Sequence, residues 1–284
     1  MYGAFFLIGL VSALASTGNV IAAAHGPVLY LLNATSGLVI AQQNLGENVT
    51  CVVPYGNQFM VATTSAGLTH FVIVANNTFY PVENIVEGNN TSPALVGTST
   101  GCAAYEGYFV AVVKDNGTLK AYFFKLNGTN LVMEKEVKAP EPEVKGGEAL
   151  VFYGPTGLYV YEGGNFTEIT NTTVNDADYM GGVLFYTTNG TLVAYSITAA
   201  TQLYTWKPAE GKACAVLALT PNEAVVGVKG SNMGVALVVG GNLKVTVGVP
   251  NVYMLSKGDG YIAAATSGNL GDGVAVIPLS WLMK

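Results

Sequence analysis

The hydrophobic pattern of the chain consists of short apolar runs separated by turns that are rich in Gly and Asn. Each of seven runs is followed by a tight turn and by a second apolar run with an aromatic or aliphatic residue near its middle. The seven runs are VIAAAHG from Val20, FMVATTS from Phe59, YFVAVVK from Tyr108, ALVFYGP from Ala149, VLFYTTN from Val183, AVVGVKG from Ala224 and YIAAATS from Tyr261. Their mean spacing of about 40 residues fits the period of four-stranded propeller blades, roughly 40 to 45. The pattern predicts an all-β, seven-bladed β-propeller of four-stranded antiparallel blades, forming one domain over residues 1–284.

The turn residues agree with this prediction. Asn116-Gly117 and Asn189-Gly190 are dipeptides that supply the two positive φ angles of a type I′ hairpin, and Gly67 and Gly157 occupy the matching place in their repeats.

Four returning strands carry a local signature of Gly, an optional Thr, Leu, two residues and then Tyr or Phe. It spans Gly67 to Phe71, Gly117 to Tyr122, Gly157 to Tyr161 and Gly190 to Tyr195. Together with NGTLVAYSITAATQLYTW (Asn189 to Trp206) and PVLYLLNATSGLVIAQ (Pro27 to Gln42), it resembles the repeat of quinoprotein-like (PQQ-type) β-propellers. The Thr-Gly turn of that repeat is altered here, and only Trp206 stands at its final Trp position. The resemblance implies a propeller fold without the quinone site, so no cofactor is expected.

The first sixteen residues are apolar and allow three interpretations. YGAFFLI and GLVSALAS would supply the outer strand of the last blade and the inner strand of the first, which closes the ring. Alternatively, Ala4 to Leu14 resembles the apolar part of a secretory signal, with Ala13-Leu14-Ala15 before Ser16 as its cleavage pattern. The third interpretation is the apolar N-terminal helix of a pilin-like filament subunit. We favour the closing strands, because removal of residues 1–15 would leave two strand edges unpaired.

Charge is scarce in this chain. Charged residues make up 11% of it and hydrophobic residues 50%, whereas ordinary soluble domains carry roughly 25% charged residues. This composition excludes disorder, which requires low hydrophobicity with high charge. A net charge of −6 and the absence of arginine leave no basic surface for nucleic acid.

N-glycosylation sequons are the strongest indication of compartment. The chain has 22 Asn and 37 Ser plus Thr, for which chance gives about three Asn-x-Ser/Thr sequons, the acceptor pattern of surface loops in secreted proteins. Ten occur, at Asn33, Asn48, Asn76, Asn89, Asn90, Asn116, Asn127, Asn165, Asn171 and Asn189. The Asn-Gly-Thr sequences at Asn116, Asn127 and Asn189 are equally typical of hairpin turns. The remaining excess predicts an exported, glycosylated protein.

The three cysteines, Cys51, Cys102 and Cys214, occupy similar places in the first strands of their blades. Inner strands of neighbouring blades converge near the axis, so Cys51 and Cys102 can pair in an oxidising compartment. The alternative is that all three pack as small buried hydrophobes.

Catalytic chemistry finds little support. His25 and His70 have no nucleophile and acid at a recognisable motif spacing, and no Cys/His metal spacing is present. Asp176 and Asp178, with Asn175, are the candidates for a hard cation such as Ca²⁺, although short acidic turns are commonly just solvated. The charged stretch from Glu134 to Glu148 is interpreted as a solvated connection between blades 3 and 4 rather than a docking site.

We therefore expect a non-enzymatic structural or adhesion protein, extracellular or at the cell surface, without catalytic residues or a transmembrane helix. Its expected partners are copies of itself, other surface proteins and glycans, with assembly into a filament or lattice. The alternatives are a ligand- or carbohydrate-binding or enzymatic propeller that works at the mouth of its channel, and the pilin-like filament subunit.

Overall fold

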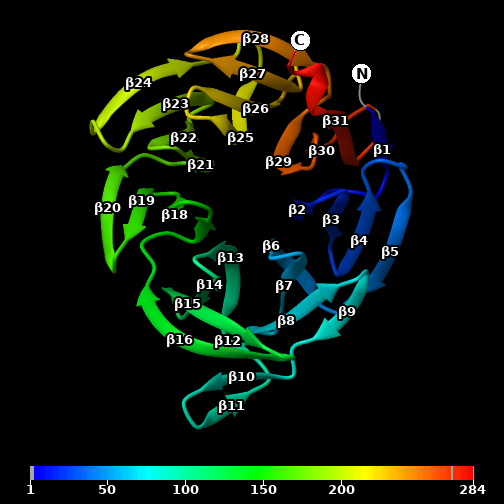
Figure 1. Cartoon of the computed structure of the whole chain (residues 1–284), viewed down its shortest axis with the longest axis vertical. Helices are drawn as coiled ribbons and strands as arrows, with labels where there is room; N and C mark the ends of the chain where they lie inside the picture. Colours follow the sequence, from blue (N-terminus) through cyan, green and yellow to red (C-terminus); the bar gives the residue numbers. More distant parts are fainter. Residues whose placement is uncertain (1–2, 270, 284) are drawn as a thin grey trace.

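The computed structural model describes residues 3–269 and 271–283, which form a ring of seven β-sheets around a central axis (Figure 1). Each sheet is a blade with a core of four antiparallel strands, and the only described helix is the 3-10 turn η1 (Leu279–Trp281). The predicted all-β, seven-bladed propeller is confirmed. No helix among the described residues is long and apolar enough to span a membrane.

In four blades, four strands that follow one another in the chain form the whole sheet. From the axis outward, blade 1 has β2 (Ala13–Thr17), β3 (Val20–His25), β4 (Val28–Asn33) and β5 (Val39–Asn44); blade 4 has β17 (Glu143–Lys145), β18 (Leu150–Gly154), β19 (Gly157–Glu162) and β20 (Asn165–Thr170); blade 5 has β21 (Asp176–Met180), β22 (Val183–Thr188), β23 (Thr191–Ser196) and β24 (Thr201–Trp206); and blade 6 has β25 (Lys212–Thr220), β26 (Glu223–Lys229), β27 (Val235–Val239) and β28 (Asn242–Val247).

Blades 2 and 3 carry additional strands. Blade 2 has β6 (Asn48–Tyr55), β7 (Gln58–Ser65), β8 (Leu68–Ala75) and β9 (Thr78–Pro81), with β12 (Leu95–Val96) also paired to β8; blade 3 has β13 (Thr98–Tyr105), β14 (Tyr108–Asp115), β15 (Thr118–Asn127) and β16 (Asn130–Lys138). The hairpin of β10 (Asn84–Glu87) and β11 (Asn90–Ser92) is inserted between the two blades, and β10 pairs in parallel with β16. This hairpin projects from the rim of the ring (Figure 1).

Blade 7 is built from both ends of the chain. It contains β29 (Val252–Gly258), β30 (Tyr261–Thr266), β31 (Gly273–Pro278) and, as the outer strand, β1 (Ala4–Phe6). Phe6 is the register partner of Val274, and a Cβ atom on Gly273 would lie 1.8 Å from the carbonyl oxygen of Phe6. Glycine therefore permits the close approach of the closing strand. Because residues 4–6 and 13–17 are strands, the N-terminal helix of the pilin-like alternative is wrong, whereas retention of residues 1–15 stays a prediction.

The predicted hairpin turns are present where Asn-Gly supplies them. Asn116 and Gly117 have φ values of 49° and 78°, and Asn189 and Gly190 have values of 50° and 76°. Gly67, at 75°, also has the positive φ expected of it. The prediction for Gly157 is wrong, because its φ is not positive. A Cβ atom there would lie 2.7 Å from the Thr170 carbonyl oxygen, so glycine is explained by close packing against β20.

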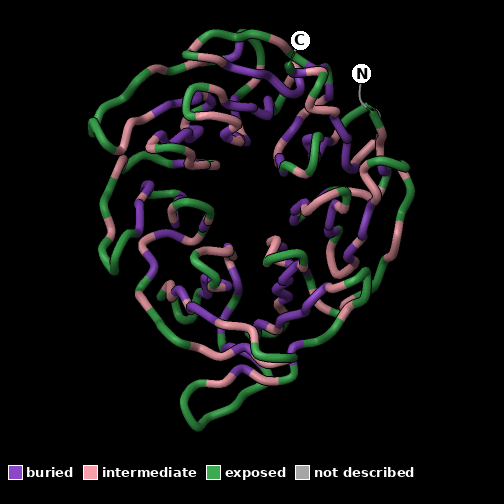
Figure 2. Tube along the Cα trace, viewed as in Figure 1, coloured by how far each residue is buried: buried purple, intermediate pink, exposed green. Residues whose placement is uncertain are grey.

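The hydrophobic core of the described residues is divided among the seven interfaces between neighbouring blades, with one cluster of buried side chains at each. The middle strands are therefore covered on both faces, as the buried segments inside the ring of Figure 2 show. All six residues of β30 are buried, and β7 buries five consecutive residues. Two covered faces leave few positions for charged side chains, which accounts for the low charge of the chain.

The alternation of strand direction defines two faces of the ring. Face A carries the turns between the first and second and between the third and fourth strands of each blade. Face B carries the turns between the second and third strands and the connections from one blade to the next.

Candidate functional site

The axial channel is the first candidate site. The innermost strands surround the axis (Figure 1) and enclose a cavity of about 510 Å³. Most of its wall consists of small and aliphatic residues from β2, β6, β13 and β29, such as Ala15, Val52 and Ala103. Charged side chains enter the wall from Glu143, Lys145, Asp176 and Lys257. The chemistry of the channel therefore depends mainly on what these charges contact.

Asp176 and Asp178, the candidate metal ligands, are hydrogen-bonded across a blade interface instead. The Oδ2 atom of Asp176 accepts the Val216 N–H at 2.9 Å, and Oδ2 of Asp178 accepts the Ala218 N–H at 2.7 Å. Their Oδ1 atoms accept N–H groups of the residues that follow them, at 2.9 and 3.1 Å. Among the described residues, no group of three or more His, Cys, Asp or Glu side chains could hold a metal ion. The two carboxylates thus join the inner strand of blade 5 to that of blade 6.

Blade 4 contributes further groups to this cluster. Lys145 Nζ lies 2.9 Å from Asp176 Oδ1, and the Tyr153 hydroxyl donates to the same oxygen at 3.2 Å. Burial alone would lower the pKa of Lys145, but the carboxylates of Asp176 and Asp178 outweigh it and leave the pKa raised. Burial, followed by Asp176, raises the pKa of Glu143 to about 7 and that of Tyr153 well above its usual value. The charged part of the channel is therefore an ion-pair network that joins blades 4, 5 and 6.

The cysteines proposed as a pair are joined in the structure. Cys51 of β6 and Cys102 of β13 form a disulfide with a Cα–Cα distance of 6.0 Å, and both line the channel. Cys214 is free and half-buried, and burial raises the pKa of its thiol. The disulfide links the inner strands of blades 2 and 3 covalently.

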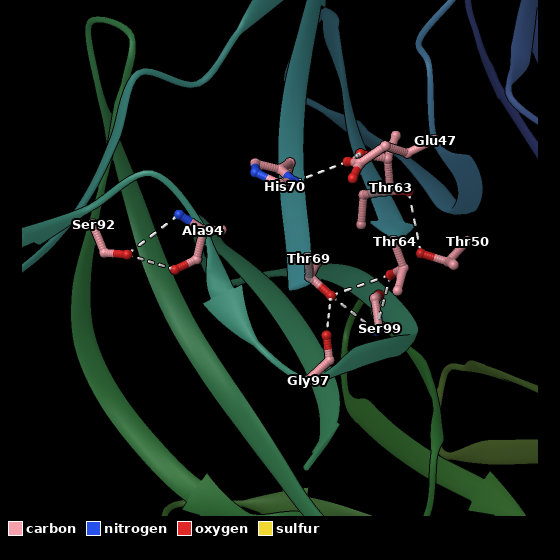
Figure 3. A network of polar contacts seen from close by, with 11 residues as sticks. Glu47, Thr50, Thr63, Thr64, Thr69, His70, Ser92, Ala94, Gly97 and Ser99 are labelled. Carbon is pink, nitrogen blue, oxygen red and sulfur yellow. Dashed lines mark hydrogen bonds and ion pairs between the residues drawn. The ribbon is translucent and has the colours of Figure 1, made fainter. Parts of the chain in front are cut away.

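A polar network lies on the face B side of blade 2 and continues into blade 3 (Figure 3). Glu47 Oε1 accepts the Thr63 hydroxyl at 2.9 Å and lies 2.8 Å from His70 Nδ1. Beside it, buried Thr69 donates to the Gly97 carbonyl at 2.9 Å and accepts the Ser99 N–H at 3.0 Å. These hydrogen bonds pair polar groups that would otherwise be buried without a partner between two packed blades.

The other histidine, His25, contacts a backbone carbonyl group. Its Nδ1 lies 2.8 Å from the Leu10 carbonyl oxygen, in the connection between blades 7 and 1. The contacts of His25 and His70 are therefore structural bonds within and between blades.

The charged stretch from Glu134 to Glu148 connects blades 3 and 4 as its composition predicts, and six of its eight charged residues are exposed. It runs from the outer strand β16 to the inner strand β17, and Glu141 is only 2% exposed. The Glu141 carboxylate accepts the backbone N–H of Thr156 at 2.9 Å and also its hydroxyl. Its partners lie in the next hairpin of blade 4, which explains the burial of a charge in a stretch that looks solvated.

The second candidate site is a groove on face A across blades 2 to 5, which we call the tyrosine groove. Two adjoining hollows of about 370 and 540 Å³ share Tyr105 and Glu106. The aromatic and acidic side chains that define it are Tyr55, Tyr105, Glu106, Tyr108, Glu148, Tyr161, Glu162 and Tyr179. The sequence did not indicate this groove, because its residues come from turns of four blades. The only signal was a Tyr at the end of several first strands.

Contacts within the tyrosine groove order its floor. Lys125 Nζ lies 4.2 Å above the Tyr108 ring, and Lys135 Nζ lies 5.1 and 5.0 Å from the Phe123 and Tyr161 rings. The Tyr55 hydroxyl donates to the Gly107 carbonyl at 2.5 Å. Glu106 and Glu162 are exposed and both lie close enough to Tyr105 to raise its pKa, after the larger effect of burial. The rim of the groove is therefore acidic and its floor aromatic.

The ten sequon asparagines lie in turns, at strand ends and in the connections between strands. Nine are exposed, and Asn33 is half-buried, with its Oδ1 accepting the backbone N–H groups of Thr35 and Ser36 at 2.9 Å. Asn89 and Asn90 lie at the tip of the β10–β11 hairpin. The fold leaves these positions accessible to modification, and glycosylation stays a prediction.

Comparison with known proteins supports the fold. No family model matches the chain, and no curated protein matches it in sequence. Among solved structures, it is similar to "Structure of U3-55K" (TM-score 0.71, 11% identity, 96% of each chain covered) and to "Crystal structure of RRP9 WD40 repeats" (0.71, 11%, 95% of this chain and 94% of that one). A chain of "Crystal Structure of Mitotic Checkpoint Complex" aligns with a TM-score of 0.74 at 12% identity, covering 98% of this chain and 91% of that one.

These similarities support the seven-bladed β-propeller fold, and one of the similar structures is titled as WD40 repeats. They confirm the fold that the PQQ-type resemblance implies. They do not show membership in the PQQ-type superfamily.

Proposed function

We propose that this propeller is a non-enzymatic protein-interaction scaffold, exported and N-glycosylated, that acts at the cell surface or outside the cell. The observation that carries the proposal is the tyrosine groove, where five tyrosines and three glutamates gather on one face. Tyrosine is enriched at protein interfaces. Among the similar structures, one is titled as WD40 repeats and another is a chain of a complex, which agrees with a scaffold role. In contrast, Asp176, Asp178 and Lys145 of the channel already hold blades together.

Export is supported by the ten sequons and by the disulfide, because disulfides persist in oxidising compartments. We expect the intact mass of native protein to exceed the 29.5 kDa of the polypeptide and to fall when N-glycans are removed enzymatically. Peptide mapping then identifies the modified asparagines and the first residue of the mature chain. A native mass equal to that of the bare polypeptide contradicts the glycosylation.

The interaction role is tested by replacing groove tyrosines. Chemical cross-linking of native surface material, read by mass spectrometry, is expected to place partner peptides at blades 3 and 4. The double variant Tyr105→Ser and Tyr179→Ser should lose most of these cross-links, because it removes aromatic contact area from the groove. Tyr80→Ser is the matched control, since Tyr80 is 44% exposed on the outer strand of blade 2, away from the groove. Equal cross-linking of the double variant and the control would contradict the proposal that the tyrosine groove binds a partner.

A further inference from the structure

Two lysines lie directly opposite each other on face B of blade 6. Lys212 of β25 and Lys229 of β26 are register partners at the start and end of their strands, and both are exposed. Neither takes part in an ion pair among the described residues. Like charges that face each other across two strands destabilise a sheet. The connection before β25 adds Lys207 and one acid, Glu210, so this edge of blade 6 carries a basic surface that the chain itself leaves uncompensated. We call Lys207, Lys212 and Lys229 the lysine edge.

The tyrosine groove has the opposite character. Glu106 and Glu162 both lie close to Tyr105 and form no ion pair among the described residues. The cations of the groove, Lys125 and Lys135, already lie over its aromatic rings. A lysine keeps its charge in such a contact, so three glutamates against two lysines leave the groove with a small net negative charge.

Acidic residues and lysines are also unevenly distributed along the chain. Residues 101–180 contain eleven acids and six lysines, whereas residues 201–284 contain six lysines and four acids. The acidic segment forms blades 3 and 4 and the inner strand of blade 5, while the basic segment forms the outer strand of blade 5 and blades 6 and 7. The acidic rim of the groove and the lysine edge thus lie on different blades and on opposite faces of one molecule.

We propose that the partner of the tyrosine groove is a second copy of this chain, whose lysine edge on face B docks against the groove on face A. This inference rests on the proposed interaction role. The two surfaces differ, so the contact is heterologous and each added copy leaves one groove and one lysine edge free. Repetition of such a contact gives an open assembly unless its rotation closes a ring. Charge complementarity favours contact between a groove and a lysine edge over contact between two grooves or two lysine edges.

The test is sedimentation velocity on the full chain over a range of concentrations, after enzymatic removal of N-glycans. Gly190 follows the sequon residue Asn189, and a Cβ atom on Gly190 would lie 3.0 Å from Lys212 Cγ. A glycan on Asn189 would therefore lie beside the lysine edge, so N-glycans are removed first. At about 0.05 M salt we expect association that increases with concentration. At about 0.5 M salt, where exposed charges are screened, we expect a monomer. A wild-type chain that stays monomeric at low salt overturns the proposal.

Two variants, each with the charges of one surface removed, test which surfaces meet in the contact. The groove variant Glu106→Gln with Glu162→Gln and the edge variant Lys212→Gln with Lys229→Gln should each be monomeric, with the dissociation constant raised by about tenfold or more. Mixed in equal amounts, they should form a dimer and stop there, because the mixture contains only one intact pair of surfaces. The matched control, Glu168→Gln with Lys244→Gln on outer strands, should associate as the wild type does. Undiminished association of either variant, or no dimer in the mixture, overturns the proposal.

The two proposals fail differently. If the wild-type chain is monomeric but groove variants still lose cross-links to other surface proteins, the interaction role stands and self-association is wrong. If groove variants lose neither self-association nor cross-links, both are wrong.

Discussion

Replacement of Asp176 by alanine is expected to lower the free energy of unfolding by about 3 kcal/mol. The substitution removes the acceptor of the Val216 N–H and leaves Lys145 without its ion-pair partner, 2.9 Å away. Both groups lie where blades 4, 5 and 6 meet, and the Asp176 side chain is only 15% exposed, so water replaces the lost contacts only in part. Chemical unfolding followed by fluorescence measures the change.

Asp115→Ala is the control for Asp176, because Asp115 is exposed at the end of β14. It should change the free energy of unfolding by less than about 0.5 kcal/mol. Asp176→Asn retains the shape of the side chain and loses its charge, so its effect should fall between the two. Equal stability of Asp176→Ala and Asp115→Ala would show that the network does not hold the blades together.

The second large effect is expected from the Cys51–Cys102 disulfide. It closes a loop with a sequence separation of 51 residues, and loss of a cross-link of that span costs about 4 kcal/mol when chain entropy dominates. Cys51→Ser should therefore destabilise the protein strongly, whereas Cys214→Ser, which affects no cross-link, should cost about 1 kcal/mol or less.

Thiol labelling gives an independent measurement of the disulfide. The unfolded chain should show one reactive thiol without reductant, that of Cys214, and three after reduction. Three thiols without reductant would exclude the bridge and leave the alternative of buried, unpaired cysteines.

The repeat unit was predictable from sequence because each blade repeats the same local chemistry. An apolar second strand, an Asn-Gly or Gly turn and a third strand with an aromatic or aliphatic residue near its middle can be read within about 20 residues, the range over which hairpin signals operate. The β10–β11 hairpin escaped prediction, since ENIVEGNNTS is short and polar and pairs with β16, more than 40 residues later in the chain. Its position depends on the assembled rim of blade 3.

The candidate site was less predictable because its contacts also join residues that are far apart in the sequence. The Glu141 carboxylate is stabilised by Thr156, and the Asp178 carboxylate by the backbone of Ala218. Neither partner is adjacent in sequence, so composition alone suggested solvated acids and a cation site. The tyrosine groove likewise exists only after four blades have packed side by side. Long-range contacts decide the chemistry of this molecule, while local contacts decide its strands.

The pairing of β1 with β31 also governs the order of folding. Ala4 faces Val276, so the last sheet cannot be completed until almost the whole chain has left the ribosome. Contacts of such sequence separation form slowly because loop closure precedes any gain from pairing. Until then, the free edge of β31 is open to pairing with another chain. Ring closure is therefore the step at which a nascent molecule is most exposed to misassembly.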